Sequence, residues 1–144
     1  MTPDYRSKFE ATVGAFLGSD AVHEPERIKF IQPAKNRYYI PDFKTTAGVY
    51  LETKGKWTVE DRMKHLWLKE QNPDKRIVII FMNARVKIRK GSPTSYGDWA
   101  TKQGLEWYDW KDGIPQEIIR KIDEDKLSHR DTRRSRRTNS RVVK

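Results

Sequence analysis

The chain has no cysteine, and this absence excludes several classes of protein. Disulfide-stapled scaffolds, zinc sites with thiolate ligands and enzymes with a thiol nucleophile all need cysteine. Histidine is scarce, and its three residues (His23, His65 and His129) lack the spacing of a metal-binding motif. A metal in this protein is therefore expected to bind through oxygen ligands, which suit magnesium, calcium or manganese.

Long apolar segments are also missing. No run approaches the roughly 20 apolar residues that cross a bilayer, and the first residues, MTPDYRSKFE, lack a signal-peptide pattern. The sequence therefore predicts a cytoplasmic protein with no membrane partner. Hydrophobic residues make up only 35% of the chain, yet aromatic residues make up 11%, and disordered chains are usually aromatic-poor. We expect one domain with a small compact core.

Positive charge is in excess, with 30 Lys and Arg against 20 Asp and Glu, a net charge of +10. This excess favours a polyanionic partner, either nucleic acid or an anionic membrane. Residues 129–144 hold seven basic residues and one acidic residue, a net +6, whereas residues 1–128 hold 23 and 19, a net +4. We expect residues 1–128 to form the folded domain and residues 129–144 to form a basic disordered tail.

Hydrophobic spacing, capping residues and helix breakers predict alternating helices and strands. The helices are expected at residues 7–17, 58–72, 96–103 and 115–127. The strands are expected at residues 38–40, 49–54, 76–82, 85–90 and 105–110, with the first two paired as a hairpin. In the second helix, an inward apolar stripe is expected at Val59, Met63, Leu66 and Trp67. This order predicts an α/β domain, a mixed β-sheet flanked by helices.

One group of charged residues falls on the predicted hairpin. Asp42 follows the first strand, while Glu52 and Lys54 share one face of the second, because alternate strand residues point the same way. The hairpin is expected to bring the Asp42 carboxylate beside Glu52. Two carboxylates and the Thr53 carbonyl would hold a hard divalent cation that acidifies a bound water. Lys54 would stabilise charge on a phosphate, and together these groups suit phosphodiester hydrolysis.

Each of these residues also has an ordinary interpretation. A Glu–Lys pair on a strand is commonly a solvated surface, and a PD…ExK pattern often occurs by chance. Glu10 occupies the third position of a capping box that begins at Ser7, which explains it without catalysis. His65 is expected to be a solvated helix residue rather than a general base.

Basic residues follow the buried strand and recur in the tail. The cluster after the strand, at residues 85–90, suits either a charged sheet edge that blocks aggregation or phosphate binding assisted by nearby hydroxyls. The tail suits either a DNA-binding arm or a solubilising appendage. The candidate DNA-binding residues are Arg85, Lys87, Arg89, Lys90, Ser92, Thr94, Ser95, Arg133, Arg134, Arg136 and Arg137.

Five segments carry a resemblance to a known family. They are residues 5–10 (YRSKFE), 39–43 (YIPDF), 52–55 (ETKG), 61–66 (DRMKHL) and 90–97 (KGSPTSYG). With these segments the chain resembles the bacteriophage endonuclease I family of junction-resolving enzymes over about residues 5–110. The last segment is long and unusual, so it is the most specific of the five.

The resemblance implies a PD-(D/E)xK nuclease fold and a homodimer that exchanges segments between protomers. Glu10, Asp42, Glu52 and Lys54 fall on the family's catalytic positions, and Glu10 is expected to join the other three from the partner chain. The implied nuclease domain is residues 1–128, with the N-terminal helix and bridging connector at residues 1–37 and the catalytic core at 38–128.

The resemblance also implies the reaction and its setting. The implied substrates are four-way (Holliday) junctions and other branched DNA, cut by paired nicks. The implied metal is Mg²⁺, held by Asp42, Glu52, Thr53 and Glu10, with Mn²⁺ as an expected substitute and no small-molecule cofactor. The implied place of action is the cytoplasm of an infected bacterial host.

Two other functions stay open on the sequence. One is a different nuclease of the same fold, of a mismatch-nicking or restriction type. The other is a non-catalytic basic protein that binds nucleic acid. The loop at residues 91–97 favours the junction enzyme over the first alternative. Convergence of Asp42, Glu52 and Lys54 would argue against the second.

Overall fold

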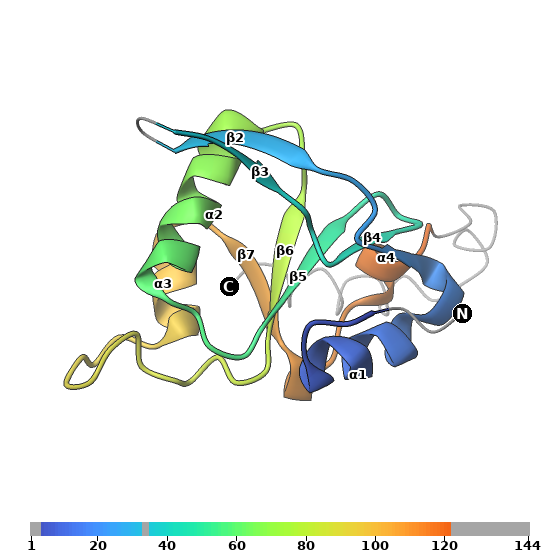
Figure 1. Cartoon of the computed structure of the whole chain (residues 1–144). Coiled ribbons are helices and arrows are strands. Elements are labelled where there is room, and N and C mark those ends of the chain that lie inside the picture. Colours follow the sequence, from blue (N-terminus) through green and yellow to red (C-terminus); the bar gives the residue numbers. More distant parts are fainter. Residues whose placement is uncertain (1–3, 33–34, 122–144) are drawn as a thin grey trace, which may run out of the picture.

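The computed structural model describes residues 4–32 and 35–121, which form a five-stranded mixed sheet with helices on both faces (Figure 1). The helices are α1 (Lys8–Leu17), α2 (Val59–Gln71), α3 (Tyr96–Lys102) and α4 (Gln116–Ile119), with 3₁₀ turns η1 (Gly18–Asp20) and η2 (Trp110–Asp112). The sheet strands are β1 (Ala21–His23), β4 (Phe43–Thr45), β5 (Tyr50–Lys54), β6 (Ile77–Phe81) and β7 (Glu106–Asp109). Strands β2 (Ile28–Gln32) and β3 (Lys35–Tyr39) form a separate two-stranded sheet, which we call the ribbon. The predicted α/β class is therefore confirmed.

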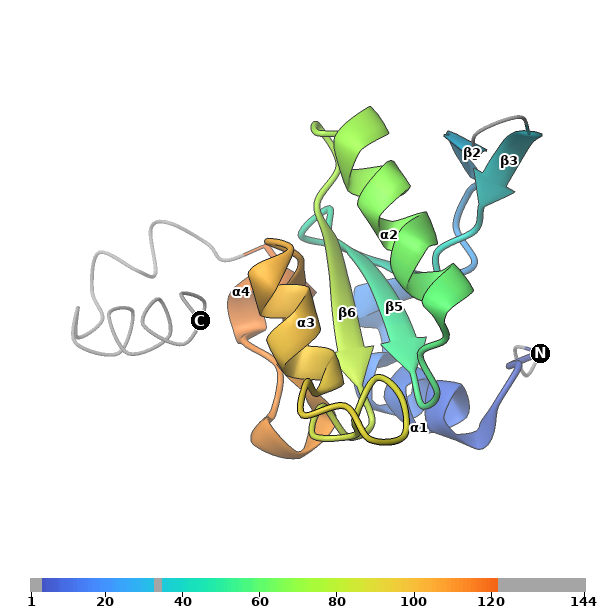
Figure 2. The ribbon, with the colours of Figure 1, turned by 90° about the vertical axis from the view of Figure 1, so that its left-hand side faces the viewer.

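The sheet has the strand order β1-β4-β5-β6-β7. β1, β4 and β5 are antiparallel neighbours, whereas β5, β6 and β7 are parallel. Parallel neighbours need a crossover connection, and α2 and α3 supply the two crossovers. Both of these helices cover one face of the sheet, while α1 and α4 lie on the other face (Figures 1 and 2).

β6 lies between β5 and β7, and it is buried on both faces as its continuous apolar run predicted. Val78 and Ile80 belong to the core that includes Leu17 of α1. Ile79 belongs to a second core that includes Ala100 of α3. The alternation of a strand thus lets one segment hold both helical layers on the sheet.

The helix boundaries follow the predicted capping signals. The Ser7 hydroxyl accepts the Glu10 N–H at 3.0 Å at the start of α1, which ends at Gly18 with φ of +53°. A reciprocal capping box links Thr58 and Asp61 at the start of α2, and Ser95 caps α3 through the N–H of its third residue. These caps satisfy N–H groups that lack partners inside the helix.

The hairpin predicted across residues 38–54 is wrong. β3 pairs with β2, where Tyr39 lies opposite Ile28, and β5 pairs instead with β4. Pro41 has no N–H for a strand ladder, and the chain leaves β3 there before β4 begins. Asp42 therefore lies next to the start of β4, and it still reaches β5.

The apolar stripe predicted for α2 is correct only in part, since Leu66 and Trp67 are half-buried and Trp67 packs against a core cluster. Val59 and Met63 are exposed, by 60% and 36%, and the buried face carries Arg62, His65 and Leu68. The Arg62 guanidinium donates to the Trp57 carbonyl oxygen at 2.9 Å and lies 5.6 Å from the Trp99 ring centroid. His65 lies on the same buried face, so it is buried rather than solvated.

The strand predicted at residues 85–90 is wrong as well. These residues form a loop, with one isolated bridge between Lys87 and Ser95. Both edges of β6 are already paired with β5 and β7, so the alternating segment has no free neighbour there. A turn in which Arg85 N–H donates to the Asn83 side chain at 3.0 Å directs the chain away.

The C-terminal helix is shorter than expected within the described residues. α4 ends at Ile119, and Arg120 has extended backbone angles. The rest of the predicted helix to residue 127 and the basic tail at 129–144 lie outside the described residues. Over residues 4–32 and 35–121, no helix combines the length and apolar character needed to cross a membrane.

Gly97 gives a test of this packing. A Cβ at Gly97 would lie 2.8 Å from two ring carbons of Trp107. Alanine in an open helix is more favourable than glycine by about 1 kcal/mol. Here we expect Gly97→Ala to lower the free energy of unfolding by about 2 kcal/mol, because the ring must move. Chemical denaturation measures this change.

Gly55→Ala is the matched control, since its Cβ would meet only the Met82 Cε, at 3.5 Å. We expect its free energy of unfolding to stay within about 0.5 kcal/mol of wild type. A Gly97→Ala protein as stable as wild type would contradict the close packing of α3 on Trp107.

Candidate active site

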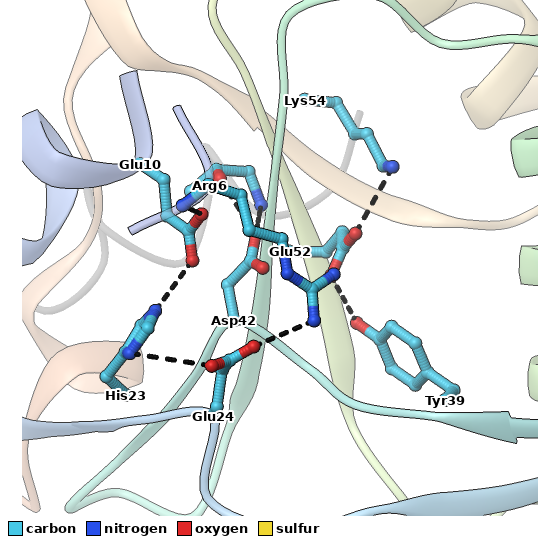
Figure 3. A network of polar contacts seen from close by, with 9 residues as sticks. Arg6, Glu10, His23, Glu24, Tyr39, Asp42, Glu52 and Lys54 are labelled. Atoms are coloured by element: carbon cyan, nitrogen blue, oxygen red, sulfur yellow. Dashed lines mark hydrogen bonds and ion pairs between the residues drawn. The ribbon is translucent and has the colours of Figure 1, made fainter. Parts of the chain in front are cut away.

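The C-terminal half of β5 carries the polar residues that the sequence singled out. Glu52 lies on the face covered by α2, and Thr53 lies on the opposite face, as alternation requires. Asp42 approaches from the start of β4, and its Oδ2 accepts the Thr53 N–H and the Thr53 hydroxyl, both at 2.8 Å. The predicted convergence of Asp42 with β5 is therefore present (Figure 3).

Glu52 is 6% exposed, and both of its oxygens have partners. The Tyr39 hydroxyl donates to Oε1 at 2.8 Å, and the Lys54 ammonium lies 3.3 Å from Oε2. Lys54 also lies 3.3 Å from Oδ1 of Asp61, in the first turn of α2. Burial alone lowers the pKa of Lys54, but the two carboxylates outweigh it and raise that pKa above its ordinary value. The lysine therefore carries its positive charge.

Negative charge is crowded around Asp42. Burial and the charge of Glu52 raise the pKa of Asp42 from 3.8 to about 7, with Glu10 adding a smaller effect and the Thr53 hydrogen bonds opposing it. Burial and the Glu52 carboxylate also raise the pKa of the Tyr39 phenol well above its ordinary value. Asp42 and Glu52 thus repel each other in a buried place where water screens them poorly.

Glu10 enters the site from α1 and is 2% exposed. Its Oε1 accepts the Arg6 N–H at 2.8 Å, and its Oε2 lies 2.8 Å from Nε2 of His23. The carboxylate therefore caps the chain at Arg6 rather than at Ser7, where the capping box predicted it. Arg6 and His23 both extend this network to Glu24, at 2.7 and 3.9 Å (Figure 3).

The position of α1 bears on the expected exchange of segments. In the single chain described, α1 packs on the sheet of its own chain, and Val13 and Leu17 join the core with Leu51 of β5. Glu10 accordingly reaches Asp42 electrostatically within one chain. The expectation that a partner chain supplies Glu10 remains a prediction.

Comparisons with known proteins identify the family of the chain. The family model of phage endonuclease I matches residues 2–136. Endonuclease I of Escherichia phage T7 is 40% identical over 119 residues, which cover 81% of this chain and 78% of that protein. The chain belongs to the phage endonuclease I family. Endodeoxyribonuclease 1 of Enterobacteria phage T3 is 41% identical over 108 residues, covering 73% and 71%. The resemblance read from the sequence is confirmed, and the protein is an endonuclease.

The residues at β5 of this endonuclease suit a hard divalent cation in ligand type. Asp42 and Glu52 present carboxylate oxygens, and the repulsion that raises the pKa of Asp42 is what a bound cation relieves. Among residues 4–32 and 35–121, no three acidic or histidine side chains already form a metal cluster. The carboxylate of Glu10 is engaged by His23 and Arg6, so it would have to turn to become a ligand.

The candidate DNA-binding residues divide into three groups. Arg85, Arg89 and Lys90 are exposed in the loop between β6 and α3, which Figure 1 shows projecting away from the sheet. Of the other four residues of this loop, three make hydrogen bonds within it or at the start of α3, and one is half-buried. Lys87 donates to the Pro93 carbonyl, Ser92 accepts the Thr94 N–H, Thr94 is half-buried, and Ser95 caps α3. Arg133, Arg134, Arg136 and Arg137 lie outside the described residues.

Several residues of the site were missed by the sequence analysis. Tyr39 counted only as a strand residue, although it stands three positions before Asp42. His23 lacked a motif, and its contact with Glu10 depends on the pairing of β1 with β4. His65 packs between the rings of Tyr39 and Trp57, and burial with nearby lysines lowers its pKa to about 3. It is therefore neutral, which spacing alone did not indicate.

Asp42 predicts an unusual pH dependence of stability for the metal-free protein. The unfolded state loses the Asp42 proton near pH 3.8, whereas the folded state keeps it up to about pH 7. The free energy of unfolding therefore falls as pH rises through this window. We expect Asp42→Asn to be more stable than wild type at about pH 8, with this advantage about 2 kcal/mol smaller at about pH 5.

Denaturation in the presence of a chelator measures both values. Asp74→Asn, at an exposed turn, is the matched control, and we expect it to follow the wild-type pH dependence. Equal pH dependence in wild type and Asp42→Asn would contradict the crowding of negative charge at Asp42.

Proposed function

We propose that this endonuclease hydrolyses phosphodiester bonds of branched DNA, with Mg²⁺ bound at the end of β5 in a PD-(D/E)xK site. The observation that carries the proposal is the pair of buried carboxylates, Asp42 and Glu52, beside a charged Lys54. Structural carboxylates are normally paired one to one with cations or donors. Here two carboxylates repel each other, which is typical of groups that hold a divalent cation.

Each group has a distinct role in this proposal. Asp42, Glu52, the Thr53 carbonyl and Glu10 would hold the cation. A bound Mg²⁺ supplies a water of lowered pKa and neutralises charge on the phosphate. Lys54 is held by Glu52 and Asp61 at the rim of the site, where its ammonium would bind a non-bridging phosphate oxygen. Thr53 orients Asp42 through its N–H and hydroxyl.

The substrate is proposed from the family and from charge. One relative is named an endodeoxyribonuclease, which supports DNA as the substrate. The proposed selectivity for four-way (Holliday) junctions and other branched DNA rests on the resemblance of the loop at residues 90–97. The exposed Arg85, Arg89 and Lys90 in the loop after β6 support contact with phosphates of the DNA.

The proposed assembly is a homodimer with exchanged N-terminal segments, acting in the cytoplasm of an infected bacterium. Paired nicks across a junction require two active sites at a fixed separation, and a twofold dimer supplies them. The apolar face of α1, with Val13 and Leu17 buried on the sheet, supports docking of this helix either on its own chain or on a partner.

Glu52→Gln tests the hydrolytic role. We expect the rate of cleavage of a four-way junction in Mg²⁺ to fall about a hundredfold or more, because a metal ligand loses its charge. Junction binding in Ca²⁺ should remain close to wild type. The assay also compares the junction with matched duplex and single-stranded DNA, and we expect wild type to prefer the junction.

The matched control is Glu70→Gln, an exposed residue of α2, which should cut at the wild-type rate. Junction cleavage by Glu52→Gln at the wild-type rate would overturn the metal role of the β5 carboxylates. Equal wild-type cleavage of all three DNAs would instead point to a less selective nuclease of the same fold.

The basic loop after β6 gives an independent test of DNA contact. A triple substitution to alanine at Arg85, Arg89 and Lys90 should weaken junction binding and reduce the slope of log Kd against log salt by about 2 to 3. Fluorescence anisotropy at several salt concentrations measures this slope. Substituting Lys102 and Lys111 by alanine, at exposed positions on α3 and η2, controls for the loss of positive charge alone. An unchanged slope in the triple variant would exclude the loop from the interface.

A further inference from the structure

Tyr39 joins the β2–β3 ribbon to the carboxylate of Glu52. It is the last residue of β3 and is 3% exposed, and its hydroxyl donates to Glu52 Oε1 at 2.8 Å. The ribbon is hydrogen-bonded as a separate sheet, outside the five-stranded sheet that carries Glu52. A side chain from one sheet therefore fixes a group of the active site on the other (Figure 3).

The Tyr39 ring has little freedom to move. Ile28 lies opposite it in the ribbon, and both residues share a core with Leu68 of α2. The His65 ring meets it edge-on, with centroids 5.8 Å apart, and the Lys64 ammonium lies 5.6 Å from its centroid. Packing on several sides thus determines where the hydroxyl points, independently of Glu52.

Glu52 is consequently held by two donors of different origin. The hydroxyl of Tyr39 donates to Oε1, and the ammonium of Lys54 forms an ion pair with Oε2. Lys54 comes from the same strand as Glu52, and its side chain has four rotatable torsions, although the ion pair with Asp61 restrains it. Tyr39 is the donor with the rigid side chain, so it contributes most to the orientation of the carboxylate plane.

We propose that Tyr39 is a positioning residue that orients Glu52 for binding of the divalent cation, through its hydroxyl and without touching the substrate. This assignment rests on the proposed function, in which Glu52 is a metal ligand. The packing of the ribbon against α2 then affects metal affinity, although no residue of the ribbon is a metal ligand in this proposal.

Tyr39→Phe tests the assignment because it removes the hydroxyl and keeps the packed ring. We expect Mn²⁺ affinity, measured from free Mn²⁺ by electron paramagnetic resonance without DNA, to fall roughly tenfold. Single-turnover junction cleavage should fall by a similar factor at fixed Mg²⁺, with junction affinity in Ca²⁺ unchanged. Tyr38→Phe is the matched control, since this neighbour is 53% exposed on the other face of β3, and it should change neither quantity.

Two further backgrounds separate positioning from a general structural effect. In Asp42→Asn, Tyr39→Phe should still lower Mn²⁺ affinity, whereas in Glu52→Gln it should have no further effect. An equal loss in both backgrounds, or no loss in wild type, would overturn the role of Tyr39. If wild type itself neither binds Mn²⁺ nor cuts DNA in Mg²⁺, the proposed function fails instead. If wild type is active and Tyr39→Phe keeps the wild-type Mn²⁺ affinity and cleavage rate, the role of Tyr39 is wrong and the proposed function stands.

Discussion

The burial of two carboxylates around strand β5 is the constraint on which the other features depend. An ionised carboxylate away from water is strongly unfavourable unless donors or cations surround it. Thr53 supplies donors to Asp42, while Tyr39 and Lys54 supply them to Glu52. Three separate parts of the chain therefore take their places from polar contacts as well as from apolar packing: the turn before β4, the ribbon and the first turn of α2.

The crowded negative charge at this candidate site opposes stability. The raised pKa of Asp42 records free energy that folding spends to keep two like charges together. The apolar cores on the two faces of β6 compensate for it, since Val78, Ile79 and Ile80 are almost fully buried. A bound cation would remove the repulsion, so metal binding and folding are linked in this protein.

Local signals in the sequence predicted the parts of the fold that local forces determine. Caps at Ser7, Thr58 and Ser95 begin helices, and the apolar run at residues 76–82 contains the buried strand β6. Pairing was not predictable in the same way, because β3 can pair back with β2 or forward with β5, and strand-forming residues alone do not separate these two hairpins. The buried face of α2 includes Arg62, which donates to the Trp57 carbonyl, and hydrophobic periodicity does not predict a buried arginine. The same limit applies to the site: the Asp42–Glu52–Lys54 group followed from spacing, whereas Tyr39 and His23 join it through tertiary contacts.

The chain order of the site has a consequence for synthesis of the protein. Glu10, Asp42, Glu52 and Lys54 all precede β6, whose parallel pairing with β5 encloses that strand in the sheet. A growing chain therefore contains all four candidate residues before the strand that encloses β5 has been synthesised. Their arrangement in the sheet is complete only once β6 pairs with β5, after most of the domain has been made.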